Sequence, residues 1–257
     1  MLGVLAITNT LPAQKLPNIQ TVSVRAPAGL KIDGKAAEWG NQFKANNKTT
    51  DIFYTMANDT EKLYLLIQAK HESIIKKMVM GGVTLSISSN KRDIKNAVKI
   101  TFPIYDINNP ASYFRFNKPK NIKSLNVDSL MIVHNKSLST KYKLIGVSGI
   151  ETITDSLLSV YNSEGLNAAA LFDSQLNYTY EMAIPLKYLK LNNSQKLTYN
   201  IKLNAATVDG RKLEFLPGRN IVAYTAANGV NYVLGDDPQN MTLVAPTDFW
   251  GEYTLAK

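Results

Sequence analysis

The sequence predicts an all-β protein, an antiparallel two-sheet β-sandwich of the jelly-roll-like type with one or two short helices. Three observations lead to this fold class. Runs of alternating apolar and polar residues recur along most of the 257-residue chain, clusters of Asn, Gly, Asp and Pro separate them, and no regular alternation of strand and helix occurs. Half-buried strands of this kind close a core by stacking two sheets about 10 Å apart.

The strand signals are runs in which every second residue is apolar. They are Ile52–Met56, Leu63–Ala69, Val83–Ser88, Val98–Phe102 and Ile201–Ala205. The first two are joined by Asn58–Glu61, whose residues favour a tight turn, so these two runs predict a hairpin.

Helical signals are short. Ser73–Met80 predicts two turns, and Pro185–Leu189 predicts one turn with proline at a permitted first position. The stretch Tyr105–Asn126, with two prolines and several Asn and Lys residues, predicts a long excursion from the sheet. Gly235–Pro238 predicts a plain turn.

Composition excludes several classes of function. The chain has no cysteine and only two histidines, which leaves out thiolate metal sites, cysteine nucleophiles and most imidazole chemistry. No apolar run of about 18 residues is present, so no membrane span is expected. The net charge of +9 is carried by scattered lysines rather than a basic cluster, which argues against nucleic acid as a partner. No phosphate-binding or nucleophile-elbow motif occurs.

The first thirteen residues, Met1–Ala13, form a short apolar stretch that ends in small and turn residues. This pattern resembles the latter part of a secretory signal peptide, although a basic start is missing. An ordinary first strand is the alternative. Export predicts a protein that is secreted, periplasmic or on the cell surface, with residues 1–19 as leader and 20–257 as one domain.

Four patches stand out by their order along the chain. They are Asp33-Gly34 followed by Glu38-Trp39, then Asn58-Asp59 followed by Leu63-Tyr64, then Tyr178–Leu189 with Glu181 and Ile184-Pro185-Leu186, and last Phe249–Leu255. Together they resemble the family 9 carbohydrate-binding modules and their wider superfamily of extracellular β-sandwich domains, which includes the DOMON type. The resemblance covers roughly residues 20–257 and implies the same fold.

The resemblance implies a carbohydrate or glycan as partner. In the characterised type of this family two tryptophans enclose a terminal sugar, because pyranose faces stack on aromatic rings. Trp39 and Trp250 lie inside the patches, and packing is the ordinary role for both. The predicted ligand-binding residues are those of the aromatic excursion together with Trp250: Tyr105, Tyr113, Phe114, Arg115, Phe116 and Trp250. The alternative is that the excursion folds its aromatic rings back onto the sandwich.

A structural calcium ion is also implied by the resemblance, with Asp33, Glu38 and Asp59 as its candidate ligands. Calcium prefers six to eight oxygens and more clustered acids, so stabilisation of turns is the competing role for these three carboxylates. No other cofactor is expected.

These observations predict a non-catalytic binding module. The alternatives are a structural or protein-interaction sandwich that has lost the sugar site, and a polysaccharide hydrolase. Hydrolysis needs two facing carboxylates, and Glu181 is the residue that such an enzyme would use. The competing role for Glu181 is a hydrogen bond to the backbone or to a lysine near the Pro185 turn.

Overall fold

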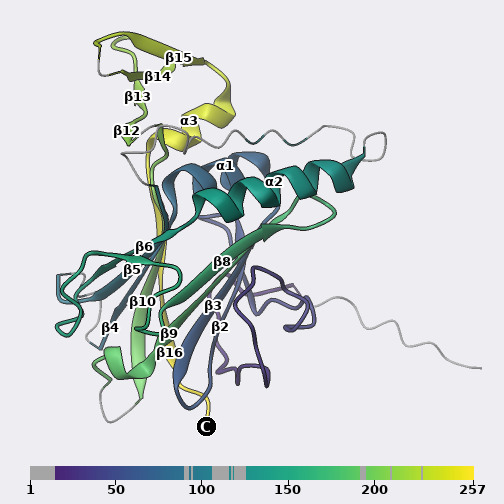
Figure 1. Cartoon of the computed structure of the whole chain (residues 1–257), viewed down its shortest axis with the longest axis vertical. Coiled ribbons are helices and arrows are strands. Elements are labelled where there is room, and N and C mark those ends of the chain that lie inside the picture. The colour runs from purple at the N-terminus through teal and green to yellow at the C-terminus, as the bar shows by residue number, and fades with distance from the viewer. Residues whose placement is uncertain are drawn as a thin grey trace, which may run out of the picture.

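The computed structural model describes residues 15–89, 93, 95–105, 116, 118, 126–191, 195–208, 210–226 and 228–257. Its body consists of two antiparallel sheets stacked face to face (Figure 1). The first sheet has the order β1-β2-β3-β9-β8, with β1 (Ala45–Asn47), β2 (Ile52–Asn58), β3 (Lys62–Ala69), β9 (Tyr178–Pro185) and β8 (Asn167–Phe172). The second has the order β16-β10-β4-β5-β6-β7, with β16 (Thr247–Thr254), β10 (Lys196–Leu203), β4 (Val83–Ser88), β5 (Val98–Ile104), β6 (Leu144–Ser148) and β7 (Leu157–Ser159). The predicted antiparallel sandwich is confirmed.

Two small sheets lie outside this sandwich. One pairs β11 (Thr207–Val208) with β12 (Arg211–Lys212), and the other contains β13 (Glu214–Phe215), β14 (Val222–Thr225) and β15 (Asn231–Gly235). The three-stranded sheet extends beyond one end of the body (Figure 1). The sequence analysis did not predict these strands, because each is only two to five residues long.

The core lies between the facing sheets and follows the predicted alternation. Side chains at every second position point inward, and buried tyrosines occur among the aliphatic residues. Tyr54 from the first sheet and Tyr199 from the second share a hydroxyl–hydroxyl hydrogen bond of 2.9 Å, which satisfies both polar groups inside the core. The predicted hairpin of β2 and β3 is present, with Met56 opposite Leu65.

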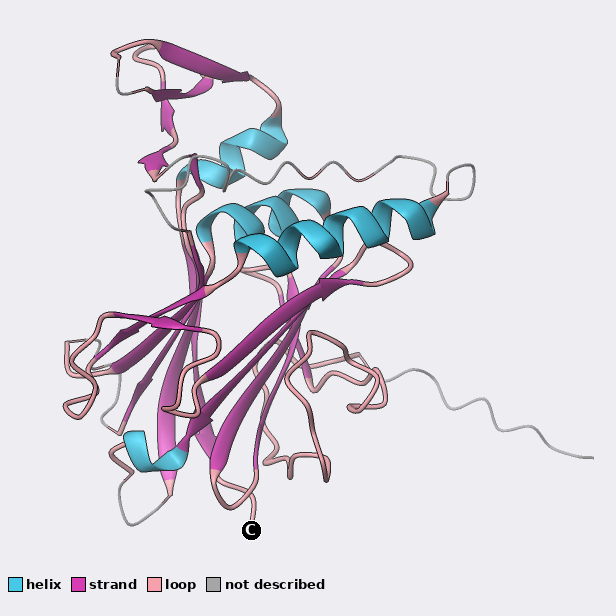
Figure 2. Cartoon of the chain, in the orientation of Figure 1, coloured by secondary structure: helices cyan, strands magenta, loops and turns pink. Residues whose placement is uncertain are grey.

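Most of the helical structure lies at one end of the sandwich (Figure 2). Within the described residues the α-helices are α1 (Glu72–Gly81), α2 (Val127–Lys141) and α3 (Pro238–Val244), and the 3-10 turn η3 (Leu186–Tyr188) lies at the other end. The predictions for α1 and for the turn after Pro185 are confirmed. None of the helices within the described ranges is long and apolar enough to cross a membrane.

Two helices differ from the sequence analysis. The fifteen-residue α2 was not expected, since only Leu138 is buried along it and no apolar stripe marks it in the sequence. Asn126 starts this helix, and its side chain accepts from Ser129 N at 3.2 Å. The predicted plain turn at Gly235–Pro238 instead leads into α3, because Asp237 caps that helix by accepting from Gln239 N at 2.8 Å.

The outer faces of the two sheets differ in what covers them. The outer face of the first sheet is packed by the segment before β1, where Trp39 and several aliphatic residues contact Ala57, Tyr64 and Ala183. The outer face of the second sheet is polar, because the outward positions of β10 and β4 hold Ser, Thr, Asn and Lys. Thr84, Ser86, Ser88, Thr198 and Asn200 on this face are nevertheless buried, at 3 to 8% exposure.

Candidate functional site

Glu181 on β9 is fully buried beneath the loop that contains Asp33 and Gly34. Its Oε2 accepts from the backbone N–H groups of Asp33 (3.0 Å) and Gly34 (2.8 Å), and its Oε1 accepts from Trp39 Nε1 (2.7 Å). Burial raises the pKa of this carboxyl above its usual value, and the three donors oppose the rise. Glu181 holds the loop against the sheet and does not face a cleft from which it could act on a polysaccharide.

The three residues predicted to bind calcium stabilise turns. Asp33 accepts from Lys35 Nζ at 2.8 Å, Asp59 accepts from the Tyr64 hydroxyl at 2.6 Å, and Glu38 accepts from a backbone N–H at 3.4 Å. Over the ranges that the structure describes, no group of three His, Asp or Glu side chains is arranged to hold a metal ion. Calcium binding stays a prediction.

Two members of the predicted aromatic site are turned toward the body of the protein. Phe116 is buried and stacks on Phe172 of β8, with ring centroids 4.7 Å apart and planes at 17°. The Tyr105 hydroxyl donates to the backbone carbonyl of Val79 in α1. Tyr113, Phe114 and Arg115 lie outside the described residues. Binding through this segment stays a prediction, and Phe116 itself is a core residue.

Trp250, the remaining predicted residue, lies on the outer face of the second sheet. Along β16, Phe249, Gly251 and Tyr253 are buried, whereas Trp250 points the other way and is partly exposed. Gly251 is required at its position because a Cβ atom there would lie 2.2 Å from the Tyr199 ring. Glycine at this position therefore lets β16 pair with β10 beside the Tyr199 ring, while the Trp250 side chain points outward.

Two carboxylates flank Trp250 on the same face, because residues two apart on a strand share a side. Asp248 Oδ2 accepts from Asn200 Nδ2 at 2.6 Å, and Asn200 lies directly opposite Trp250 in the strand register. Glu252 Oε2 pairs with Lys196 Nζ at 2.7 Å. We call these five residues the Trp250 face, and in it each carboxylate is oriented by a neighbour on β10.

Hydroxyl groups continue this face across the sheet. Thr198 on β10 lies opposite Ser88 on β4, and Asn200 lies opposite Ser86. Thr84 and Thr101 share a hydroxyl–hydroxyl hydrogen bond of 2.8 Å between β4 and β5. Thr84, Ser86, Ser88 and Thr198 are only 5 to 8% exposed, so little of this row is open to a ligand and the exposed part of the face lies on β16.

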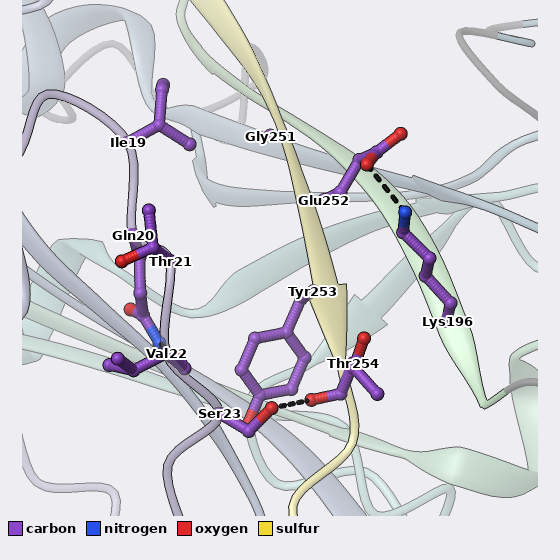
Figure 3. A pocket seen from close by; sticks show the side chains of 10 residues that line it. All are labelled: Ile19, Gln20, Thr21, Val22, Ser23, Lys196, Gly251, Glu252, Tyr253 and Thr254. Carbon is purple, nitrogen blue, oxygen red and sulfur yellow. Dashed lines mark hydrogen bonds and ion pairs between the residues drawn. The ribbon is translucent and has the colours of Figure 1, made fainter.

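A groove opens beside the Trp250 face, at the edge of the second sheet. It has a volume of about 490 Å³, and Figure 3 shows its lining residues on the segment 19–23 and on the two strands β10 and β16. Ser23 closes one end by donating its hydroxyl to the Thr254 carbonyl at 2.6 Å. Lys196 and Glu252 belong both to this groove and to the Trp250 face, so the two surfaces are continuous.

The two carboxylates of this surface are too far apart to act together in glycoside hydrolysis. Asp248 and Glu252 are four residues apart on one strand, which corresponds to about 13 Å. Paired glycosidase carboxylates are about 5 to 9.5 Å apart. The arrangement fits hydrogen bonding to a ligand better than catalysis on it.

The sequence analysis identified Trp250 and missed its polar neighbours. The alternation in β16 already placed Asp248 and Glu252 on the side of Trp250, and this signal was available. Asn200 and Lys196 are about fifty residues earlier in the chain, and only the pairing of β10 with β16 brings them there.

The fold and this site define an antiparallel β-sandwich with a polar outer sheet face around one partly exposed tryptophan. No protein-family model and no curated protein matches the chain. Among solved structures, it is similar to a family 9 carbohydrate-binding module from Caldicellulosiruptor kristjanssonii in complex with glucose. The alignment covers 91% of this chain and 95% of that one, at 13% identity and a TM-score of 0.37. Glucose is a ligand of that protein, and the function of this chain has to be inferred from its own residues.

Proposed function

We propose that this chain binds carbohydrate through the Trp250 face. The observation that supports it is a partly exposed tryptophan on a polar sheet surface, between two carboxylates that are each held in place by a side chain of β10. Sugars present apolar ring faces and hydroxyl edges, so they bind where an aromatic ring lies beside oriented polar groups.

The groove beside the Trp250 face favours an oligosaccharide over a single sugar. Its volume is about 490 Å³, and it runs between β16 and the segment 19–23. The outward Ser, Thr and Asn residues of β4 and β10 are buried, so a chain of sugars would extend from Trp250 along this groove rather than across those strands.

The proposed role is non-catalytic and extracytoplasmic. The wide separation of Asp248 and Glu252 and the burial of Glu181 both favour binding over hydrolysis. The apolar amino-terminal stretch supports export to the periplasm, the cell surface or the medium.

Tryptophan fluorescence tests this proposal directly. The chain has two tryptophans, and Trp39 is held against Glu181 on the other sheet. We expect a saturable change in emission on titration with an oligosaccharide panel, with and without calcium. Trp250→Ala should remove the change and weaken binding at least tenfold, because it removes the stacking ring. Calorimetry supplies the affinity independently of the fluorophore.

The matched control is Tyr161→Ala, which removes the exposed ring of a residue 79% accessible on another part of the surface. It should leave affinity within twofold of the unchanged protein. An affinity that survives Trp250→Ala, or a panel in which no saccharide binds, would contradict the proposal.

One observation favours a second candidate, a protein partner that adds a strand to β16. This strand is at the sheet edge, and the Thr254 carbonyl points away from β10, since it accepts from Ser23. The backbone N–H and C=O groups of successive strand residues point alternately to the two sides, so those of Asp248, Trp250 and Glu252 also point away from β10. Their amide hydrogens should exchange fast in dilute protein. Protection that grows with protein concentration would indicate strand pairing between copies and favour this candidate.

A further inference from the structure

The strand β15 forms a free edge of the small three-stranded sheet. The order in this sheet is β13-β14-β15, so β14 occupies one side of β15 and no described strand occupies the other. The sheet projects beyond the end of the sandwich, with β15 on its outer side (Figure 1). Asn231, Tyr232 and Val233 are exposed along this strand, Val233 to 58%. The edge is therefore open to another strand.

The register with β14 determines which backbone groups of β15 face outward. The Val230 carbonyl, just before β15, accepts a backbone hydrogen bond of 2.9 Å from the residue opposite it in the chain of β14. Bonded and non-bonded pairs alternate in an antiparallel ladder, so Tyr232 also bonds to β14. The N–H and C=O groups of Asn231 and Val233 therefore point away from β14. The backbone hydrogen bonds of the described residues include none to these four groups.

This edge lacks the usual protection against strand pairing. Edge strands of soluble proteins commonly carry a charged residue or a proline. The stretch Ile221–Gly235 contains neither, whereas β16, an edge of the second sheet, carries Asp248 and Glu252. The chain has a net charge of +9, so two copies repel each other over much of their surface. An uncharged edge lets them meet without that local repulsion.

We propose that β15 pairs with β15 of a second copy, antiparallel and centred on Tyr232. In this register Asn231 of each copy lies opposite Val233 of the other, and both residues direct their backbone groups toward the interface. Each such pair exchanges two hydrogen bonds, so the two pairs form four. The two small sheets become one continuous sheet of six strands, related by a two-fold axis.

The side chains support this register. Tyr232 lies opposite Tyr232 of the second copy, on the sheet face where its ring stacks on Tyr224 with centroids 5.3 Å apart and planes at 13°. Pairing extends these two stacked rings to a row of four, and cross-strand aromatic contacts stabilise a sheet. On the other face, the exposed Val233 packs beside Asn231 of the second copy.

Other registers use the edge less fully. The pairing of β14 with β15 shifts between Val222 and Ala223, so the regular part of β15 ends after Val233. A shift by two residues places either Asn231 or Val233 opposite itself and leaves the other without a partner on the regular edge. A shift by one residue sets outward backbone groups against groups that already bond to β14.

The proposed dimer is weak because the strand is short. β15 has five residues, and pairing adds four hydrogen bonds and a few apolar contacts. Small interfaces form transient complexes, so we expect a Kd of about 10 to 1000 µM. The dimer is also closed, because each copy has used its β15 edge and offers no second one to a further chain.

Sedimentation velocity of the full chain over about 5 to 1000 µM tests the dimer. We expect the mass to rise from 28.5 kDa toward twice that value and no further. Val233→Lys places like charges at the interface and should weaken association at least tenfold. The matched control is Val133→Lys on α2, because Val133 is 62% exposed and the change is the same. It should change association less than twofold.

Disulfide cross-linking tests the register, because the chain has no cysteine of its own. Residues opposite each other in a non-hydrogen-bonded pair have Cα atoms about 4.5 Å apart, which a disulfide can span. Tyr232→Cys should therefore form covalent dimers under mild oxidation. Val233→Cys lies opposite Asn231 rather than opposite itself, and it should cross-link at least tenfold more slowly.

Four results would overturn the proposal. They are a constant mass over the whole concentration range, equal weakening by Val233→Lys and Val133→Lys, faster cross-linking of Val233→Cys than of Tyr232→Cys, and growth beyond the dimer. A constant mass would leave the edge to a strand of a different protein. Concentration-dependent protection of amide hydrogens on β16 instead of on Asn231 and Val233 would place the contact at the other edge and would also contradict it.

The proposal is independent of sugar binding at the Trp250 face. Trp250→Ala should dimerise as the unchanged protein does, and Val233→Lys should bind oligosaccharide as the unchanged protein does. Failure of one proposal is therefore distinguishable from failure of the other.

Discussion

Lys77 is a lysine in an environment unusual for its type. Its side chain lies on the buried side of α1 and is 1% exposed. Its Nζ donates to Thr247 Oγ1 at 3.2 Å, a neutral partner. Burial without a neighbouring carboxylate lowers the pKa of Lys77 from 10.5 to about 8.

This shift predicts that the contribution of Lys77 to stability rises with pH in the mildly alkaline range. Between pH 8 and 10.5 the unfolded chain holds the Lys77 proton and the folded chain releases it, so this contribution to the free energy of unfolding increases with pH. The contribution should grow by about 1 to 2 kcal/mol from pH 8 to 9.5. Buried tyrosines, whose pKa values burial raises, lower stability over the upper part of the same range, so the Lys77 effect is measured as a difference between two proteins.

The comparison variant is Lys77→Met, which keeps the length of the side chain and removes the titrating group. The difference in free energy of unfolding between the unchanged protein and this variant, measured by urea denaturation, should grow in favour of the unchanged protein by about 1 to 2 kcal/mol from pH 8 to 9.5. A difference that does not change with pH would assign the effect to other groups.

Two tryptophans show how one residue type takes different roles in one chain. Trp39 donates its indole N–H to the buried Glu181, and its ring packs edge-on against Tyr64 at 6.4 Å. Trp250 instead is partly exposed on the outer face of the second sheet. The sequence analysis gave packing as the ordinary role of both and also included Trp250 among the predicted ligand-binding residues, and the neighbours of each residue in the folded chain make the difference.

At the scale of elements, the loop containing Asp33 and Gly34 is fixed on the first sheet by close backbone contact. Gly34 has φ of +84°, and a Cβ atom there would lie 2.7 Å from the backbone of Ala170 and Leu171 in β8. Only glycine can adopt this φ value and also lie this close to the backbone of β8. The close contact lets the Gly34 N–H reach Glu181.

We predict that Gly34→Ala lowers the free energy of unfolding by about 3 kcal/mol, because it combines an unfavourable φ with a backbone clash. Gly29→Ala is the matched control, since Gly29 has φ of +70° and no atom near the added Cβ. That variant should lose only about 1 kcal/mol. Similar losses in the two variants, measured by urea denaturation, would show that the clash is relieved by movement of the loop.

The elements that the sequence predicted are those with a strong local pattern. The β2–β3 hairpin, β4, β5, β10 and α1 all have regular apolar spacing. The helix α2 lacks it and is determined by the Asn126 cap and by contact with β8, which the sequence does not reveal. Strands of two residues, such as β11 and β12, carry too few positions for alternation to be read.

At the scale of the whole molecule, the segment 17–26 joins the edges of the two sheets. Asn58 N donates to the Val24 carbonyl at 3.0 Å on the side of the first sheet. On the side of the second sheet, the Tyr253 hydroxyl accepts from Val24 N at 3.2 Å and donates to Asn58 Oδ1 at 2.9 Å. Tyr253 therefore connects the last strand, the amino-terminal segment and the first hairpin.

Tyr253→Phe should lower the free energy of unfolding by about 1 to 2 kcal/mol, because it leaves buried partners on Val24 and Asn58 without the hydroxyl. Tyr161→Phe removes the same group from a residue that is 79% exposed and should stay within about 0.5 kcal/mol of the unchanged protein. Equal stability of the two variants in thermal and urea denaturation would contradict this role for Tyr253.

The sequence by itself determined the sandwich architecture. Alternation of apolar residues is a local property that gives each sheet one apolar face, and two sheets bury these faces by stacking them against each other. It also marked the four patches that contain Asp33, Gly34, Trp39, Glu181 and Tyr253. Only the tertiary structure decided their role: Glu181 binds the loop and Tyr253 binds the edge, so the patches hold the fold together. The candidate surface around Trp250 likewise depends on Asn200 and Lys196, which reach it through strand pairing. Pairing between distant strands is set by which packing excludes water over the whole core, and no local pattern contains that information.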